Sequence, residues 1–439
     1  MNAGDTIVAP ATPFGYSGIA VIRISGPKAF PILTKLSGEK HFANRLATLL
    51  WLKDRRGYLI DQCLATIFNG PNSYTGEDVV EISSHGNPSI IENIVDAACD
   101  CGSRLAEAGE FTRRAFFNGK MDLLQAEAVA SLIHSKSVEN TRCQQKILQG
   151  SLSNLLNNLR GKMINILSGL EYQLDLSEED LTGEENKTIS KKINTILSII
   201  KTFKETFYLG RLINRGATVV IAGEPNVGKS TLLNCLAGSN RAIVSDVPGT
   251  TRDTIEVELL MGGAPVLFVD TAGIRNAENS VEKAGVSRAL KSVENADLII
   301  SLIDKPGSKH LIQTKKPLLK VFNKCDLYAE KQNDSNIIHI SSKENTGIGV
   351  LKKAVSRALG INKISTEAMY LSTSRQYHAI NRCATALNDA QGLASCKNID
   401  IELLAFELRI ALDAVDSILG KTSPDDILNH VFGTLCVGK

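Results

Sequence analysis

The 439-residue chain has few of the features that assign a protein to a special class. Aromatic residues make up 5% of it, and tryptophan occurs once. No apolar run approaches the ~20 residues that span a bilayer. The N-terminus has no basic region followed by an apolar block, which a secretory signal requires. We therefore expect a protein with no membrane anchor and no export signal.

An excess of charge of one sign is also missing. Lys and Arg number 49 against 47 Asp and Glu, so the formal net charge is +2 and gives no bulk attraction to nucleic acid. Any RNA partner must be held by a local patch or by a second protein. The nine cysteines form an odd count without zinc-type CxxC pairs. This usage predicts reduced thiols in a cytoplasmic protein.

The hydrophobic pattern changes three times along the chain. Residues 1–118 mix short β-rich runs with Gly/Pro/Asn turns, which predicts a small α+β domain. Residues 119–215 and 365–439 repeat apolar positions at helical spacing, whereas 216–364 alternates β-branched runs with helices, as a doubly wound parallel sheet does. Each helical block alone leaves an apolar stripe unpartnered. We therefore predict one split helical domain with the α/β domain inserted between its halves.

A phosphate-binding loop opens the inserted domain. A buried strand over 218–222 is followed at once by GxxxxGKS, Gly223 to Ser230, and then by a helix. The glycines let backbone N–H groups curl around phosphate, and the helix N-terminus adds positive potential. Lys229 is expected on the β- and γ-phosphates and the Ser230 hydroxyl on Mg²⁺. The predicted nucleotide contacts in this segment are Asn226, Val227, Gly228, Lys229, Ser230 and Thr231.

The remaining nucleotide motifs follow in the expected order. A strand over 266–269 leads into DTAG, where Asp270 suits the outer shell of Mg²⁺ and the Gly273 N–H suits the γ-phosphate. Thr251, in the upstream GTTRD loop, can give the metal a second hydroxyl. NKCD and SSK follow two later strands. The predicted contacts are Gly249, Thr250, Thr251, Asp270, Thr271, Ala272, Gly273, Asn323, Lys324, Asp326, Ser341, Ser342 and Lys343.

Asp326 identifies the base. Its carboxylate can accept hydrogen bonds from N1–H and the N2 amine of guanine, whereas adenine would leave it unpaired. The predicted nucleotide is GTP, and the domain resembles the translation-factor-like branch of small GTPases.

Ras-like switches place a glutamine after DxxG to orient water, but this chain has Ile274 there. Either hydrolysis is very slow or other groups act. Asn226 could ligate an additional cation, and Glu282 could steer water through a bridge. The alternative for Glu282 is a solvated charge on a helix.

With these motifs in place, the whole chain resembles the bacterial and organellar tRNA modification GTPase family (MnmE, also called TrmE). The inserted position of the GTPase domain is shared. The resemblance is carried by short runs from end to end: Asp5–Ala9, Ala11–Pro13, Arg23–Gly26, Pro71–Asp78, His85–Gly86, Gly109–Thr112, Arg114–Asn118, Lys120–Glu127 and Cys436–Lys439.

The resemblance implies a reaction. Such proteins, with an FAD-containing partner protein of the MnmG/GidA type, add a carboxymethylaminomethyl or aminomethyl group to C5 of the wobble uridine, position 34, of certain tRNAs. The one-carbon unit is attributed to 5-formyl- or 5,10-methylene-tetrahydrofolate on the N-terminal domain, which also forms the homodimer. Homodimer and partner assemble as a heterotetramer. The implied folate residues are Arg23, Glu81, Lys120 and Lys439; by themselves, Glu81 would be a strand-edge charge and Lys439 a free tail.

The resemblance also supplies a reason for Ile274. In the family, K⁺ bound beside the phosphates replaces an arginine finger. The implied K⁺ ligands are Asn226, Ser245, Val247 and Thr250, in a loop whose Asp246 and Pro248 are further predicted nucleotide contacts. Cys436 stays open between two roles: a nucleophile that adds to C6 of uracil, or a side chain that packs the tail into the folate pocket.

Two other functions fit a GTPase. A ribosome-assembly or signalling GTPase would bind RNA without modifying it, but such proteins usually carry a basic module, which the balanced charge disfavours. A membrane-associated switch would need an anchor that the sequence lacks. We therefore predict a cytoplasmic, K⁺-stimulated GTP hydrolase of tRNA modification.

Overall fold

The computed structural model describes residues 4–176, 183–238, 256–270, 295–305, 314–328, 336–364, 369–396, 399–422 and 424–439. The fold divides into two compact units. Unit 1 comprises Met1–Ile133, Ile147–Glu179 and Asp400–Lys439, and unit 2 comprises His134–Lys146 and Asp180–Ile399.

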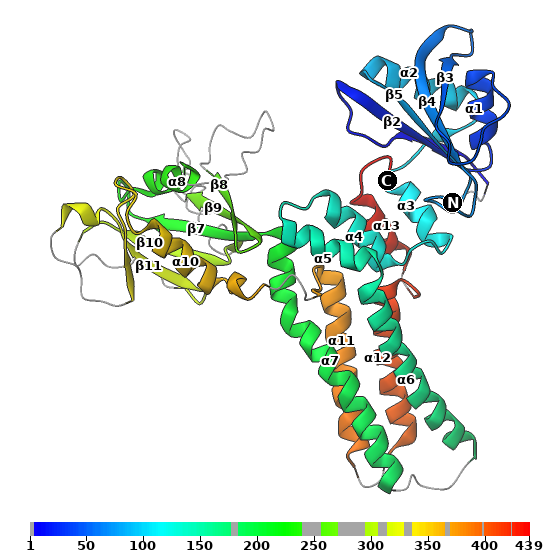
Figure 1. Cartoon of the computed structure of the whole chain (residues 1–439). Coiled ribbons are helices and arrows are strands. Elements are labelled where there is room, and N and C mark those ends of the chain that lie inside the picture. The colour runs from blue at the N-terminus through cyan, green and yellow to red at the C-terminus, as the bar shows by residue number, and fades with distance from the viewer. Residues whose placement is uncertain are drawn as a thin grey trace, which may run out of the picture. The chain divides into compact units, whose positions relative to one another are not determined.

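Unit 1 begins with a six-stranded sheet in the order β3-β4-β5-β2-β1-β6 (Figure 1). Every neighbouring pair is antiparallel except β1 and β6. Two helices pack against this sheet, α1 (Ala29–Ser37) and α2 (Pro88–Asp100). The strands are β1 (Ile7–Pro10), β2 (Ser17–Ser25), β3 (Thr48–Lys53), β4 (Leu59–Phe68), β5 (Val79–Gly86) and β6 (Arg104–Leu105).

Strand alternation separates the two faces of this sheet. Leu50 and Leu52 of β3 are buried in the core with the two helices, whereas Leu49 and Trp51 between them are exposed. Because successive side chains of a strand point to opposite faces, one face is packed and the other is open. Leu64 of β4, the cross-strand partner of Leu49, is exposed on the open face as well.

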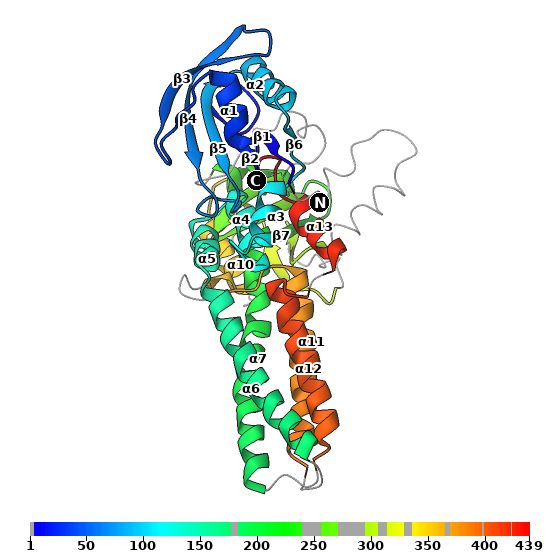
Figure 2. The ribbon, with the colours of Figure 1, turned by 90° about the vertical axis from the view of Figure 1, so that its right-hand side faces the viewer.

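Helices make up the rest of unit 1. Two long ones, α6 (Ser151–Leu176) and α12 (Ile401–Leu419), run antiparallel (Figure 2). Ion pairs join Arg160 to Asp416 and Glu171 to Arg409. The apolar stripe predicted along α6 is buried at Leu152, Leu156, Leu159, Met163 and Leu170. The helices are α3 (Glu110–Phe117), α4 (Leu123–Ile133), α6 (Ser151–Leu176), α12 (Ile401–Leu419) and α13 (Asp425–Gly433).

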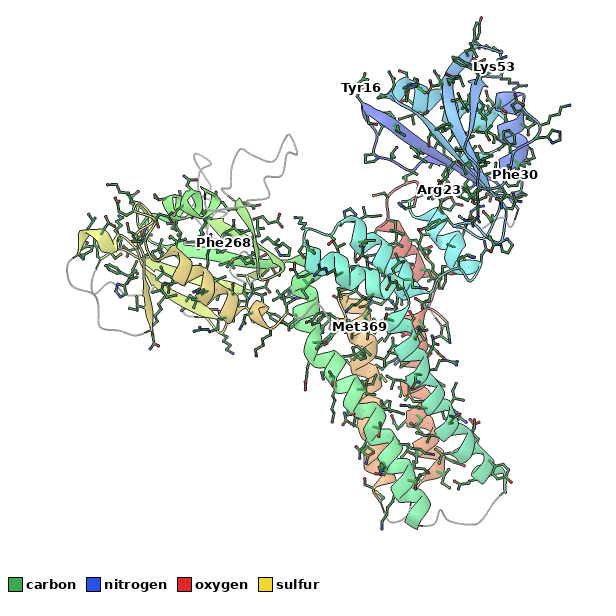
Figure 3. The ribbon with its side chains drawn as sticks, viewed as in Figure 1. Tyr16, Arg23, Phe30, Lys53, Phe268 and Met369 are labelled. Carbon is green, nitrogen blue, oxygen red and sulfur yellow. The ribbon has the colours of Figure 1, made fainter. Side chains whose placement is uncertain are left out.

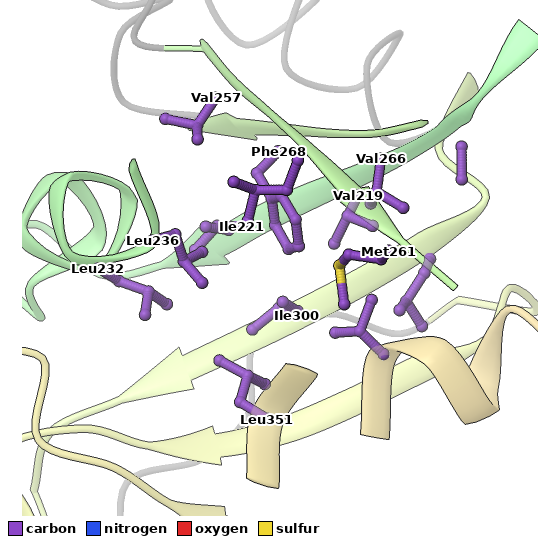
Figure 4. Packing of buried hydrophobic residues seen from close by; sticks show 14 of the residues in the cluster. Val219, Ile221, Leu232, Leu236, Val257, Met261, Val266, Phe268, Ile300 and Leu351 are labelled. Atoms are coloured by element: carbon purple, nitrogen blue, oxygen red, sulfur yellow. The ribbon is translucent and has the colours of Figure 1, made fainter. Parts of the chain in front are cut away.

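Unit 2 contains a second six-stranded sheet in the order β12-β11-β10-β7-β9-β8, parallel except for β8. Phe268 is packed in the core among apolar side chains of β7, β8 and α8 (Figure 4). The strands are β7 (Ala217–Gly223), β8 (Glu256–Met261), β9 (Ala264–Asp270), β10 (Leu298–Ile303), β11 (Leu318–Phe322) and β12 (Ile337–His339).

The described helices of unit 2 include another long antiparallel pair, α7 and α11. Phe207 stacks on Tyr377, with ring centroids 4.3 Å apart. Gly210 permits close contact with the segment before α11, because a Cβ there would lie 2.1 Å from the Leu371 carbonyl oxygen. The helices are α5 (Val138–Leu148, ending in unit 1), α7 (Gly183–Arg215), α8 (Lys229–Gly238), α10 (Ile348–Ala358), α11 (Ser374–Ala394) and the short η1 (Cys325–Leu327) and η2 (Ile361–Lys363).

The predicted fold class is confirmed: an α+β N-terminal part, long helices, and a Ras-like doubly wound domain. The domain boundaries after residues 118, 215 and 364, and the assignment of both helical blocks to one split domain, stay predictions.

Candidate functional site

The phosphate loop lies between β7 and α8, as its sequence predicts. Asn226 has φ +64° and Gly228 has φ +94°, both in the left-handed region. A Cβ at Gly228 would lie 2.4 Å from Nδ2 of Asn323, so the loop needs glycine there. Turns of this kind point successive N–H groups into one concavity, which suits an anion.

The residues that open α8 are placed for phosphate and metal chemistry. Lys229 is buried, and its Nζ donates to the carbonyl oxygens of Gly223 and Glu224 at 3.0 and 2.8 Å. The Ser230 hydroxyl donates to Oδ2 of Asp270 at 3.1 Å, and Asp270 is 1% exposed at the end of β9. A hydroxyl beside a carboxylate is the oxygen donor set that Mg²⁺ prefers.

The base-side motifs are tied to the phosphate loop by side-chain hydrogen bonds. Nδ2 of Asn323 donates to the Val227 carbonyl oxygen at 2.9 Å, and its Oδ1 accepts from the backbone N and Oγ of Ser342 at 3.0 and 2.9 Å. Lys324 donates from Nζ to the Asn226 carbonyl oxygen at 2.9 Å. The carboxylate that predicts guanine, Asp326, follows in η1 and is exposed.

One nucleotide-side residue was missed by the sequence analysis. Oδ2 of Asp304 accepts from Nζ of Lys324 at 2.6 Å. Asp304 directly follows β10, and the carboxyl ends of parallel strands are where doubly wound folds bind ligands, so its position was the available signal. Several predicted residues lie outside the described residues: Ser245, Asp246, Val247, Pro248, Gly249, Thr250, Thr251, Thr271, Ala272, Gly273, Ile274 and Glu282.

A second site joins the N-terminal sheet to the C-terminal tail within unit 1. Arg23 of β2 and Glu81 of β5 are cross-strand partners, and Nε and Nη2 of Arg23 donate to Oε1 of Glu81 at 2.9 and 2.6 Å. Nη1 of Arg23 donates to the Gly438 carbonyl oxygen at 3.2 Å. The rings of Tyr74 and Phe111 lie 5.2 and 5.6 Å from the guanidinium carbon, which holds it by cation–π contact.

The tail is fixed by its backbone. Gly438 has φ +96°, and a Cβ there would lie 2.1 Å from the Pro10 carbonyl oxygen. Val437 forms a β-bridge with Ala108. Burial lowers the pKa of the Lys439 ammonium, the charge of Arg23 lowers it further, and Glu81 opposes both effects. Lys439 therefore lies within electrostatic reach of the Arg23–Glu81 pair.

The other two predicted residues, Cys436 and Lys120, have different partners. Cys436 is exposed at the start of the tail, where its carbonyl oxygen accepts from the Lys439 N–H at 3.2 Å. Lys120 donates from Nζ to the Pro71 carbonyl oxygen at 2.9 Å. Among the described residues, no hydrogen bond or ion pair joins Lys120 to Arg23, Glu81 or Lys439.

An ion network in unit 1 also escaped the sequence analysis, although all of its members except Arg104 lie in the motifs that carry the resemblance. Arg114, 7% exposed, contacts Asp5, Glu77 and Glu110, and Arg104 contacts Asp5 and Glu110. Burial by itself would raise the pKa of Glu110, but hydrogen bonds from Arg104, the Glu107 N–H and Arg114 lower it to about 2. The network joins Asp5 and Glu77 to the 104–114 segment, three parts of the chain that are distant in sequence.

Two further observations concern the molecule as a whole. All nine cysteines lie in the described part of the chain and are free thiols. No helix in the described ranges is long and apolar enough to cross a membrane.

Comparison with known proteins places these sites in a family. The family model "GTP-binding protein TrmE N-terminus" matches residues 6–120, and "MnmE helical domain" matches 123–436. The tRNA modification GTPase MnmE of Chlorobium chlorochromatii is 36% identical across 99% of this chain and 98% of its own length. The MnmE of Methylococcus capsulatus is 37% identical across 99% of both chains.

Solved structures give a weaker match. The FeoB G domain from Methanococcus jannaschii is 28% identical across 33% of this chain and 98% of its own, with a TM-score of 0.26. The family assignment depends on the full-length relatives and on the two family models. The chain belongs to the MnmE family of tRNA modification GTPases.

Proposed function

We propose that this chain is a K⁺-stimulated GTPase that acts with an FAD-containing partner protein on the wobble uridine of certain tRNAs. The product carries a carboxymethylaminomethyl or aminomethyl group on C5 of uridine 34. One observation carries the proposal: the tail that ends in Lys439 is bound beside the Arg23–Glu81 pair. A GTPase that acted only as a molecular switch would not need a second polar site in unit 1.

The tail site fits a reduced folate, 5-formyl- or 5,10-methylene-tetrahydrofolate. The two hydrogen bonds that Arg23 donates to Glu81 both go to Oε1. Among the described residues, Oε2 of Glu81 has no hydrogen-bond partner. The Glu81 side chain is 30% exposed, so Oε2 can accept from the amino-pyrimidinone edge of a pterin. Lys439 and Lys120 would meet the glutamate tail. When bound, the folate supplies the one-carbon unit.

Cys436 is the proposed nucleophile toward C6 of uracil. A thiol that only packed the tail would be buried, whereas Cys436 is exposed. Its place at the start of the tail lets the thiolate reach a base while Gly438 and Lys439 stay bound.

For GTP hydrolysis, the loop N–H groups and Lys229 would hold the phosphates. Ser230 and Thr251 would ligate Mg²⁺, with Asp270 in the outer shell. Asn226, Ser245, Val247 and Thr250 would ligate K⁺. Glu282 would steer the attacking water through a bridge, because Ile274 cannot orient it. Exposed Asp326 would accept from guanine.

The proposed assembly is a homodimer through the N-terminal part, which joins the partner protein as a heterotetramer. The open face of the N-terminal sheet supports this, because Leu49 and Trp51 of β3 and Leu64 of β4 are exposed apolar side chains on that face. Free thiols support a cytoplasmic location.

The test is mass analysis of wobble nucleosides from cells that lack the gene. We expect unmodified uridine at position 34, restored by the wild-type chain and not by Cys436→Ser. Unchanged nucleosides in the deletion strain would remove the modification function and favour a GTPase that binds RNA without modifying it.

A further inference from the structure

The hairpin tip between β3 and β4 is an exposed basic segment that neither site uses. It consists of Lys53-Asp54-Arg55-Arg56-Gly57-Tyr58. Lys53, Arg55 and Arg56 are all exposed, and the Tyr58 side chain is 69% exposed. The N-terminal domain is nearly neutral, so three cations within four residues form a local patch of the kind that an RNA partner requires.

The tip has a defined conformation. Oδ1 of Asp54 accepts from the Arg56 N–H at 2.9 Å and from the Tyr58 N–H at 2.8 Å. Gly57, at φ +87°, donates to the Asp54 carbonyl oxygen at 3.0 Å. The carboxylate of Asp54, the single acidic residue of the segment, therefore accepts hydrogen bonds from the backbone of the turn. Because the backbone is already ordered, less entropy is lost when the arginines bind a ligand.

The three cations of the tip are not neutralised by ion pairs with neighbouring acidic side chains of the described residues. Among the described residues, Lys53, Arg55 and Arg56 form no ion pair. Burial raises the pKa of the Cys101 thiol, and the positive charges of Lys35 and Arg55 oppose that increase, while Asp100 adds to it. Lys35, in the last turn of α1, Arg55 and Asp100 therefore all lie within electrostatic reach of the Cys101 thiol.

The tip is separate from the Arg23–Glu81 site. Lys53 pairs with Leu59 of β4, whereas Glu81 pairs with Thr66, seven residues further along the same strand. Figure 3 shows Lys53 and Arg23 at opposite ends of this domain. The basic tip thus offers a second contact point far from the proposed chemistry.

We propose that this hairpin tip binds the tRNA backbone, with Arg55, Arg56 and Lys53 on phosphates and Tyr58 stacked on an unpaired base. Guanidinium forks match phosphate geometry, and an exposed aromatic ring beside them provides a face for a base. The hairpin acts as a positioning element for the family's tRNA substrate. It rests on the action on tRNA proposed above, and does not depend on folate or K⁺.

The test uses the full-length chain and an unmodified tRNA transcript with uridine at position 34, with affinity measured between 50 and 200 mM KCl. Arg55→Ala/Arg56→Ala should weaken binding roughly tenfold or more at 50 mM. The slope of log affinity against log salt should fall by about 1.4 to 1.8, because each phosphate contact contributes ~0.7–0.9. Tyr58→Ala should weaken binding about 5- to 100-fold. The separate variant Tyr58→Phe keeps the aromatic ring and should bind as tightly as the unaltered chain.

The matched control is Lys191→Ala/Lys192→Ala, which removes two adjacent exposed cations from α7. It should leave affinity and salt slope unchanged, and GTP hydrolysis without tRNA should be unaltered in every variant. Equal losses in both double variants would overturn the proposal, as would absence of tRNA binding by the unaltered chain. Normal tRNA binding with weakened flavoprotein binding in Arg55→Ala/Arg56→Ala would assign the tip to a protein partner. Wobble nucleosides, scored separately, test the modification reaction.

Discussion

The nucleotide pocket in unit 2 is built at one edge of a mostly parallel sheet, whereas the tail site in unit 1 joins residues 415 positions apart. In the first, β7, β9, β10 and β11 are parallel, so their carboxyl ends lie at the same sheet edge. The Asn323 side chain then joins Val227 to Ser342 through hydrogen bonds to the Val227 carbonyl oxygen and the Ser342 backbone N–H. In the second, Arg23 and Gly438 come from opposite ends of the sequence and meet only through the tertiary fold.

This difference has an energetic consequence. The described pocket segments each run from a strand into a helix, from β7 into α8, from β11 into η1 and from β12 into α10, so one lost contact leaves the rest in place. The tail is anchored at one end and held by few contacts, and chain ends of this kind belong to the least stable parts of a fold. Substitutions in the pocket should therefore alter nucleotide binding or hydrolysis without displacing the backbone. Substitutions in the tail should displace the tail backbone itself.

The largest effect is expected at the base contact. Asp326→Asn replaces a carboxylate that accepts two hydrogen bonds with an amide that matches xanthine better than guanine. The preference for GTP over xanthosine triphosphate should change on the order of 10⁴-fold, because the amide donor of asparagine then faces the guanine N2 amine and both donors are left unpaired. Competition binding with both nucleotides measures it. Retained GTP selectivity would mean that Asp326 does not contact the base.

The cation requirement should change next. Asn226 has φ +64°, so Asn226→Gly removes the side chain while the backbone conformation stays available. Replacing Na⁺ by K⁺ at equal ionic strength should raise wild-type hydrolysis strongly. In Asn226→Gly that difference should vanish, with a rate loss of ~10²–10³ in K⁺.

The backbone carbonyl of Asn226, which accepts from Lys324, is kept in this variant, so GTP affinity should change little. Asn226→Ala should disturb the loop more than Asn226→Gly does, because alanine disfavours the positive φ of this position. Glu282→Ala should lower the rate with little loss of affinity. Hydrolysis that is indifferent to the alkali cation would exclude the potassium mechanism.

The sequence predicted much of the pocket because its signals are local. A strand, GxxxxGKS and a helix specify one geometry, and Asp270, Asn323 and Asp326 follow strands whose carboxyl ends must share an edge. Asp304 had no motif around it and was missed. The fold class was predictable for the same reason, since period-2 and helical spacing are properties of short windows.

The tail site could not be built from such windows. No spacing rule brings Arg23 to Gly438, and only the family resemblance named Lys439. The cation–π contacts of Arg23 with Tyr74 and Phe111 were missed because such contacts have no characteristic spacing in the sequence. The same holds for the Asp5–Glu110–Arg114 network, because no spacing rule pairs Asp5 with residues more than 100 positions away.

Acid should distinguish the two regions. The pKa of Glu110 is about 2, below its ordinary value of 4.5, so its stabilising effect is complete above about pH 4.5 and is lost as pH falls toward 2. Glu110→Gln should lower unfolding free energy by about 3 kcal/mol at pH 7, and by much less near pH 2. The single tryptophan, Trp51 of β3, reports this unit by fluorescence. An equal loss at both pH values would contradict the ion-network account.

The smallest effect, and the one that best separates the regions, is expected at Gly438. A Cβ there would lie 2.1 Å from the Pro10 carbonyl oxygen, and φ is +96°, so Gly438→Ala must displace the tail. Arg23 then loses its bond to the Gly438 carbonyl oxygen, and Lys439 leaves the Arg23–Glu81 pair. The loss of a charged contact corresponds to roughly 10- to 100-fold in reduced-folate affinity, measured by calorimetry on the full chain.

Gly433→Ala is the matched control, because Gly433 ends α13 five residues earlier and a Cβ there meets nothing within 4 Å. It should bind folate normally, and both variants should hydrolyse GTP at the wild-type rate, since the pocket is held by its own strands. Unchanged folate affinity in Gly438→Ala would remove the tail from the site. A parallel fall in GTP hydrolysis would show that the two regions are coupled, and that the difference in anchoring does not isolate them.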